Sequence, residues 1–391
     1  MIYLDNAATT KIEDVSFNAM LPFLKEEYGN ASAVYEIARR SKKAVFEARK
    51  QCASLIGAMP SEIFFTSGGT ESDNWALCGA YESFRKKNTD KEKSGHIITT
   101  AIEHHAILHT AEYLESLGVS VTYLKPDKEG FISPEQVTGA LCDDTFLVSV
   151  MTANNEIGTI EPVREIADAV KSLRKDVLIH TDAVQAFGQI GLQDISKHVD
   201  LLSASSHKLG GPKGVGMLFA RDGVKFSPYI RGGMQESGRR AGTENVAGIA
   251  GFGAAAEYSF AGLDATISEE TALRDRMIAK LADITDVIIN GAYSEGDFSR
   301  RLPGNVSVCI KGIEGESALI MLDQKGICAS SGSACASGAR EPSHVLKAIG
   351  RADDEAKGSL RFTLSAHNTE EEIDTAVEVL KEIVGRLRSR G

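Results

Sequence analysis

The sequence predicts an α/β protein with a mainly parallel sheet in a large domain and a smaller α+β domain. Between about residues 60 and 220, short β-branched runs alternate with amphipathic stretches, which is typical of a parallel sheet covered on both faces. After a Gly/Ala-rich stretch near 246–260 the composition changes, and a charged amphipathic stretch leads to further strands and helices. We therefore expect a large domain over residues 13–260 and a small domain formed by 1–12 with 261–391.

The periodicity then gives the elements in chain order. In the large domain the apolar runs predict strands at 63–66, 96–100, 119–124, 145–151, 177–181, 200–204 and 215–220. Amphipathic spacing predicts helices between them at 73–86, 105–117, 134–141 and 163–173. Beyond these we expect helices at 246–260 and 265–282, strands near 287–290 and 305–310, a helix near 315–324, a strand at 360–365 and a last helix from 369.

Composition and charge exclude several classes of function. With 391 residues and a net charge of −11, the average surface would repel a nucleic-acid backbone. Continuous apolar runs stay well short of the ~20 residues of a membrane span. The N-terminus is acidic by Asp5, unlike a basic-then-apolar signal peptide, so a cytoplasmic location is expected. The six cysteines form no C-x-x-C pair and no zinc-finger spacing. Cys52, Cys78, Cys142 and Cys309 are interpreted as small buried hydrophobes, and Cys328 as a structural strand residue.

A lysine and a carboxylate stand in the order that one coenzyme requires. Lys208 follows an apolar strand, 26 positions after Asp182, which itself ends an apolar run. Pyridoxal phosphate needs a lysine for its imine and a carboxylate facing its pyridine nitrogen. Gln185, three positions after Asp182, could face the same ligand and donate to the ring's phenolic oxygen. The competing interpretations are a solvated lysine, a helix-capping aspartate and a surface glutamine.

Two further segments offer groups for a phosphate. Gly68-Gly69-Thr70 joins a strand to a helix start, where free N–H groups and the helix dipole favour an anion. It is neither a Walker A loop nor a G-x-G-x-x-G fingerprint, which disfavours nucleotide binding, and alone it could be an ordinary capped turn. Ser205 and His207 place a hydroxyl and an imidazole beside Lys208.

Three more side chains suggest roles in a reaction. His104 could stack on an aromatic cofactor or shuttle protons, or simply begin a helix. Arg361, a lone arginine on an apolar strand, could bind a substrate carboxylate or be an edge-strand charge. Cys335 lies within 330–338, where eight of nine residues are Ser, Gly or Ala. This composition predicts a mobile segment, on which a thiol could move between partners. No thiol or carboxylate at ligand spacing accompanies His104 and His105, so no metal is expected in the active site.

Taken together, these motifs resemble the NifS/IscS group of cysteine desulfurases, which are pyridoxal-phosphate enzymes of the class V aminotransferase family. The resemblance runs nearly end to end. It is carried by residues 3–10, 66–72, 103–104, 154–158, 180–185, 206–208, 211–214, 242–243, 330–337 and 360–362. It implies a fold type I transferase architecture with a seven-stranded, mainly parallel sheet.

The resemblance also assigns roles, which we state as expectations. Lys208 holds the cofactor, His104 stacks on its ring, and Asp182 meets the pyridine nitrogen. Residues near the phenolic oxygen are Asn155 and Gln185, and residues on the phosphate are Gly69, Thr70, Ser205 and His207. Thr243 would reach the phosphate of a neighbouring subunit, implying a homodimer. Asn30 and Arg361 would hold the substrate carboxylate.

The implied reaction releases alanine from L-cysteine and leaves a persulfide on Cys335. Lys208, once displaced by the substrate amine, takes the α-proton. Because an ordinary thiol with pKa ~8.5 is mostly protonated at neutral pH, a local base or positive group is expected to activate Cys335, with His104 a candidate. The sulfur then passes to an acceptor protein for iron–sulfur assembly or for tRNA or cofactor thiolation, and Cys335 could contact iron–sulfur species during that transfer.

Two departures from the family pattern bear on these expectations. The family's Gly-Asn-Pro-Ser-Ser-x-His reads here as Gly29-Asn30-Ala31-Ser32-Ala33-Val34-Tyr35, without the proline and histidine. The sequence ends at Arg390-Gly391 without the C-terminal tail that housekeeping members use to dock an iron–sulfur scaffold, which leaves the acceptor open. The alternatives are a selenocysteine lyase, another class V aminotransferase, or a cofactor-binding scaffold without turnover.

Overall fold

A seven-stranded sheet forms the centre of the larger part of the molecule. The computed structural model describes residues 1–88, 94–331 and 342–389. The sheet order is β2 (Ile63–Thr66), β8 (Gly216–Ala220), β7 (Leu201–Ser205), β6 (Leu178–Asp182), β5 (Thr145–Ser149), β3 (His96–Thr100) and β4 (Ser120–Leu124). All neighbours are parallel except β8, which runs antiparallel to both β2 and β7. The predicted mainly parallel sheet is confirmed, with strand ends shifted by up to two residues.

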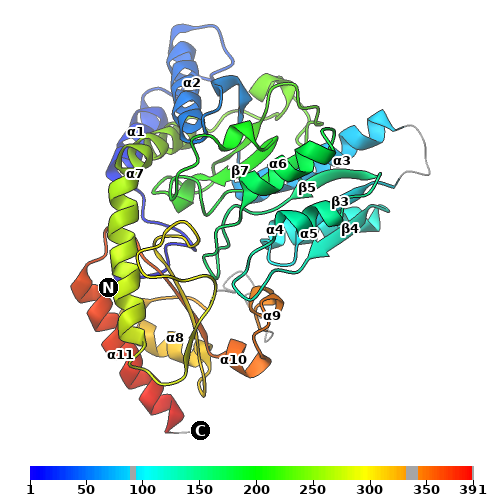
Figure 1. The fold of residues 1–391 in the computed structure, drawn as a ribbon. Coiled ribbons are helices and arrows are strands. Elements are labelled where there is room, and N and C mark those ends of the chain that lie inside the picture. The colour runs from blue at the N-terminus through cyan, green and yellow to red at the C-terminus, as the bar shows by residue number, and fades with distance from the viewer. Residues whose placement is uncertain (89–93, 332–341, 390–391) are drawn as a thin grey trace.

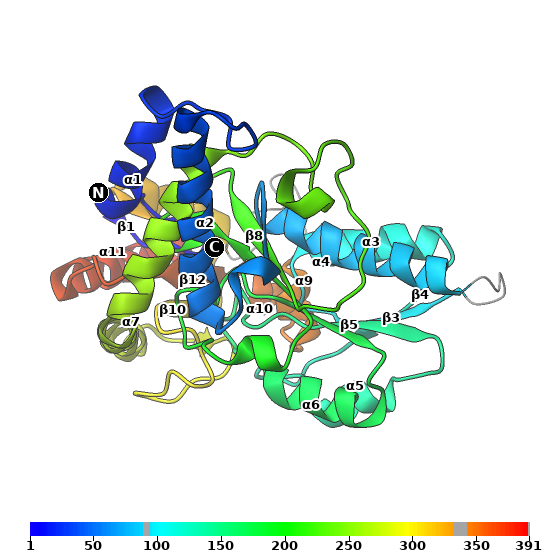
Figure 2. The same cartoon turned by 90° about the horizontal axis from the view of Figure 1, so that it is seen from above.

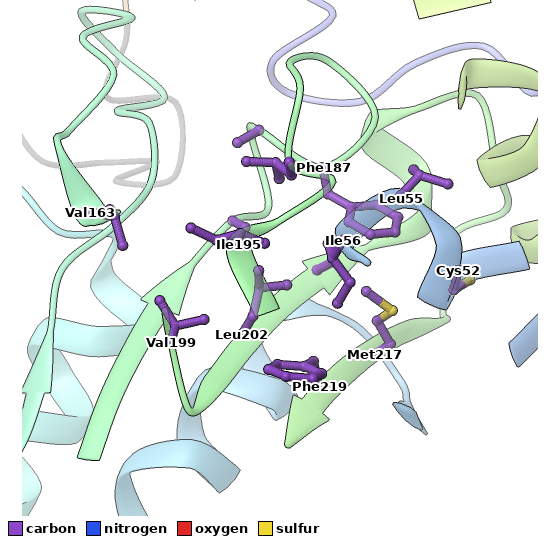
Figure 3. Packing of buried hydrophobic residues seen from close by; sticks show 14 of the residues in the cluster. Cys52, Leu55, Ile56, Val163, Phe187, Ile195, Val199, Leu202, Met217 and Phe219 are labelled. Atoms are coloured by element: carbon purple, nitrogen blue, oxygen red, sulfur yellow. The ribbon is translucent and has the colours of Figure 1, made fainter. Parts of the chain in front are cut away.

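Helices cover both faces of this sheet, as Figure 2 shows from above. One face packs against α3 (Gly69–Lys87) and α4 (His105–Ser116), with Trp75 fully buried between them and the strands. The other face packs against α2 (Glu36–Ile56), α5 (Pro134–Gly139), α6 (Val163–Leu173) and the start of α7 (Val246–Leu281). Figure 3 shows Ile56, Leu202 and Phe219 packed together in this second core.

A smaller layer of strands and helices forms beside this sheet. An antiparallel sheet contains β12 (Ser359–Thr363), β10 (Asn305–Ile310) and β9 (Val287–Ile289). A short parallel pair joins β1 (Ile2–Tyr3) to β11 (Ile327–Cys328). The helices are α8 (Gly315–Gln324), α9 (His344–Ala348), α10 (Asp353–Lys357) and α11 (Glu370–Arg388). Leu4 and residues of α7, α8 and α11 share one hydrophobic core, so the N-terminus packs with the C-terminal third.

One long helix connects the two layers and corrects the sequence-based expectation. Instead of helices at 246–260 and 265–282, α7 runs unbroken over 36 residues from α1 (Asp14–Lys25) and α2 to α11 (Figure 1). Its glycines allow close packing: a Cβ on Gly251 would lie 2.7 Å from Met20, and one on Gly253 would lie 2.5 Å from the Ala48 Cα. By length and hydropathy α7 could span a membrane, but 56% of its most apolar window is buried, as in the core helix of a globular protein.

Candidate active site

A cavity of about 380 Å³ opens where several parallel strands end, a size in the range of small-molecule sites. The chain leaves β3 towards His104, β5 towards Asn155, β6 at Asp182 and β7 at Ser205. The structure brings together ten of the predicted residues in this cavity: Gly69, Thr70, His104, Asn155, Asp182, Gln185, Ser205, His207, Lys208 and Arg361. Residues that are far apart in the sequence therefore share one wall.

Lys208 is held in the cavity by the N-terminal segment. Its Nζ donates hydrogen bonds to the backbone carbonyls of Ala7 and, at 2.8 Å, of Ala8. Thr10 holds the same segment in place, because its N–H and its hydroxyl each donate a hydrogen bond of 3.0 Å to the His207 carbonyl. The Ala7 and Ala8 carbonyls orient the amine in the same cavity that contains the Asp182 carboxyl group. Sequence reasoning missed Ala7 and Ala8 as site residues, because backbone carbonyls leave no side-chain signature.

Asp182 presents a buried carboxyl group at the end of β6. Its Oδ1 accepts the Val184 N–H at 2.8 Å. Burial raises the pKa of Asp182 to about 6, opposed by the Val184 hydrogen bond and by the charge of Lys208. A cationic partner in the cavity, such as a protonated ring nitrogen, would favour the ionised form. Beneath it His180 is fully buried between the Ser149 and Ser203 hydroxyls, at 2.9 and 3.0 Å, and burial lowers its pKa to about 3.

His104 is a neutral imidazole whose tautomer follows from its contacts. Its Nδ1 accepts the Ala106 N–H at 3.1 Å as the N-cap of α4, so the ring proton lies on Nε2. Burial, then the charges of His105 and Lys208, lower the pKa of His104 to about 4. At neutral pH it therefore cannot be the positive group considered for activating Cys335. A weak base or a stacking ring remain open to it.

We expect this neutral imidazole to make the cofactor-free protein sensitive to acid. The pKa of His104 is lower in the folded chain than its ordinary 6.5, so the unfolded chain binds a proton first as the pH falls. The stability it contributes is complete above about pH 6.5 and is lost as the pH falls towards 4, by up to about 1.4 kcal/mol per pH unit. Urea unfolding of wild type and of His104→Asn, which replaces the ring Nδ1 with an amide oxygen as N-cap acceptor but cannot titrate, should show a shallower acid slope in the variant.

The result is the difference between the acid slopes of wild type and variant, because other buried groups titrate in both proteins. His207, whose pKa burial lowers to about 4, adds to the same slope, whereas Glu161 and Glu270, whose pKa values burial raises to about 8, oppose it. Parallel slopes for wild type and variant would show that His104 gains its proton with a pKa near the ordinary value.

The start of α3 forms a cradle suited to a phosphate. A Cβ on Gly69 would lie 2.6 Å from the Val184 side chain, so only glycine fits at this first residue of the helix. Thr70, Ser205 and His207 also line the cavity, and His207 Nδ1 lies 3.2 Å from the Thr9 hydroxyl. Free helix N–H groups, hydroxyls and an imidazole form an anion site. With Asp182 and Lys208 they fit pyridoxal phosphate: an amine for its carbonyl, a carboxyl for its ring nitrogen and a cradle for its phosphate.

Arg361 reaches the cavity from β12 and is almost completely buried. Its Nη1 donates to the Asn155 carbonyl and its Nη2 to Asp5 Oδ1, both at 2.8 Å. Among the described residues its Nε has no hydrogen-bond partner. Gln185 Nε2 donates to the Ala7 carbonyl at 3.0 Å. Arg361 is therefore already oriented by Asp5 and Asn155, with donor capacity left for a carboxylate.

Two predicted residues lie outside the described lining of this cavity, and a third is not among the described residues. Asn30 is exposed and outside the described cavity lining, and its side chain accepts the Ser32 N–H at 2.9 Å. Thr243 is exposed in a separate cavity of about 200 Å³. Cys335 lies outside the described residues. The predicted roles of Asn30, Thr243 and Cys335 therefore stay predictions.

Comparisons with known proteins agree on one family. A family model described as aminotransferase class-V matches residues 2–376. A cysteine desulfurase IscS of Clostridium botulinum (strain Hall) is 49% identical over 99% of this chain and 95% of its own. One from Methanosarcina thermophila is 48% identical over 99% of this chain and 93% of its own.

Solved structures agree with these sequence relatives. A NifS-like protein has a TM-score of 0.89 at 37% identity, covering 98% of this chain and 99% of the other. A structure described as SspA in complex with cysteine has a TM-score of 0.80 at 33% identity, covering 94% of this chain and 100% of the other.

Proposed function

The chain belongs to the aminotransferase class-V family, and we propose on that premise that it is a pyridoxal-phosphate-dependent cysteine desulfurase. The observation that carries the proposal is the single cavity that joins Lys208, Asp182, the Gly69 cradle and Arg361. Full-length relatives at 48–49% identity that bear this name support the reaction. The neighbour solved with cysteine supports L-cysteine as the substrate.

Different residues of this chain have different roles around the substrate. When bound, pyridoxal phosphate supplies an electron sink for negative charge that develops at the substrate α-carbon. Asp182 would face the ring nitrogen of the bound group and would keep a proton there. The Lys208 amine, released from the Ala7 and Ala8 carbonyls, carries the α-proton. Arg361 orients the substrate carboxylate by paired hydrogen bonds.

Sulfur transfer involves only the substrate and one protein thiol, and its bonds and protons balance. The Cys335 thiolate attacks the sulfur of L-cysteine, an S–S bond forms, and the substrate C–S bond breaks. A proton goes to the substrate carbon, so the products are L-alanine and a Cys335 persulfide. The reaction needs no outside oxidant or reductant.

Mass spectrometry of the holoenzyme after exposure to L-cysteine tests the proposal directly. We expect the peptide that contains Cys335 to gain the mass of one sulfur, and we expect L-alanine to form in equal amount in a single turnover. Treatment with a reducing thiol should remove the added mass. A holoenzyme that makes neither persulfide nor alanine would refute the proposal.

We also propose a homodimer and a separate sulfur-acceptor protein. Exposed Thr243, beside a second cavity that also contains Arg240 and Glu236, supports a contact with a second copy of the chain. Sedimentation of the holoenzyme, with Thr243→Ala as the variant, tests the dimer and its link to cofactor binding.

A further inference from the structure

The chain on either side of residues 332–341 is tied to one turn on the cavity wall. Before this segment, the Ser330 and Arg361 backbones exchange hydrogen bonds of 3.1 and 2.6 Å, and Arg361 Nη1 donates to the Asn155 carbonyl. After it, the Ser343 hydroxyl donates to Glu156 Oε2. The two ties therefore reach consecutive residues, Asn155 and Glu156, from opposite ends of the segment.

The turn that receives both ties is well fixed. The Asn154 side chain accepts the N–H groups of Glu156 and Ile157 at 2.8 and 3.0 Å and donates to the Ile102 carbonyl at 2.8 Å. Gly158 closes the turn with φ of +77°, and a Cβ there would lie 2.6 Å from the Asn305 side chain. Because this turn cannot easily shift, it can serve as a fixed point for the chain that docks on it.

Ser343 serves two contacts at once. Its oxygen accepts the N–H groups of Val345 and Leu346 as the N-cap of α9, while its hydroxyl proton goes to Glu156. Both Ser343 and Glu156 are 5% exposed, so removing either partner would leave a buried polar group unpaired. His344 adds a parallel tie, because its Nε2 lies 3.0 Å from the Glu103 carbonyl, next to His104.

We propose that the Glu156–Ser343 hydrogen bond is a positioning anchor that keeps the Cys335 segment starting and ending on the same wall of the cofactor cavity. This inference rests on the proposed function. Cys335 is five residues beyond Ser330 and eight before Ser343, so full extension would carry it at most about 18 Å and about 29 Å from these points. Holding both ends limits how far from the cavity the thiol can lie. Losing the Glu156–Ser343 hydrogen bond loosens one end, so we expect the thiol to meet the substrate less often.

The anchor predicts a defect in sulfur transfer without a defect in cofactor or substrate binding. For Ser343→Ala we expect persulfide formation in a single turnover at saturating L-cysteine to be about tenfold slower. The visible absorption of the bound coenzyme and the KM for L-cysteine should stay unchanged, because Ser343 lies outside the described lining of the cofactor cavity. Ser343→Thr retains a hydroxyl and should restore most of the rate.

Two controls separate positioning from general damage. Ser133→Ala removes another serine N-cap, that of the short helix α5, whose hydrogen bonds among the described residues do not reach the turn at 154–158. It should transfer sulfur at the wild-type rate. Glu156→Leu removes the acceptor and keeps bulk at the buried site, so it should match Ser343→Ala, and the double variant should be no slower than either.

Each outcome decides the proposal. A wild-type rate in Ser343→Ala, additive losses in the double variant, or an altered coenzyme spectrum with a raised KM would overturn it. If Ser343→Ala does not fold, equal rates for Glu156→Leu and wild type would overturn it as well. A wild-type enzyme that forms no persulfide at all would instead refute the proposed function, so the two failures are distinguishable.

Discussion

Replacing Lys208 with alanine is expected to abolish turnover, lowering alanine formation from L-cysteine by about 10³-fold or more. The amine has two roles that no other residue in the described cavity lining can supply, since Lys208 is its only lysine. In the proposed function it tethers the coenzyme covalently and it carries the α-proton. The purified variant should also lose the visible absorption of the lysine-bound coenzyme, which spectroscopy measures independently of activity.

Lys213 provides the matched control for this prediction. It lies five residues further along, after the Gly210-Gly211-Pro212 turn, and its side chain is exposed. Lys213→Ala should keep both the absorption and the turnover of the wild type. Borohydride reduction of the wild-type holoenzyme should fix the coenzyme on the Lys208 peptide. If the reduced coenzyme were found on another lysine, that lysine and not Lys208 would be the catalytic amine.

The parts of the fold that could be predicted are those with a local signal. Strands β2 and β3 were predicted to the residue, because their apolar runs are buried on both faces and are bounded by turns. The unbroken course of α7 was not predicted, since its Gly/Ala half and its charged half differ in composition. The first half packs against α1 and α2 and the second against α11, contacts that no local pattern reveals. Helices α1 and α2 were not assigned from the sequence.

The candidate site likewise has a part that could be predicted from the sequence and a part that could not. Asp182 and Lys208 could be paired from their order along the chain, because parallel strands end at one edge of a sheet. The contacts of Arg361 with Asp5 and of Lys208 with Ala7 could not, since they join residues about 350 and 200 positions apart through backbone groups and side chains without a motif. The neutrality of His104 also depends on burial that no local pattern reveals.

Replacing Cys335 with alanine is expected to separate sulfur transfer from coenzyme binding. Sulfide release and alanine formation from L-cysteine should fall by about 10³-fold or more, because no other thiol is expected to reach the substrate sulfur. The visible absorption of the coenzyme should be that of the wild type, since the ten predicted residues that line the described cavity are untouched. Spectra and product assays on one preparation check both halves of the prediction.

Replacing a second cysteine tests whether the loss of activity is specific to the proposed nucleophile. Cys328 lies in β11, where its backbone pairs with Tyr3. Cys328→Ala should retain turnover because Cys328 is outside the described lining of the cavity. An enzyme that transfers amino groups would tolerate Cys335→Ala, since its chemistry needs no thiol. A selenocysteine lyase would release selenide from selenocysteine while giving no alanine from L-cysteine even in the wild type. Only a desulfurase combines an inactive, fully coloured Cys335→Ala variant with an active Cys328→Ala variant on L-cysteine.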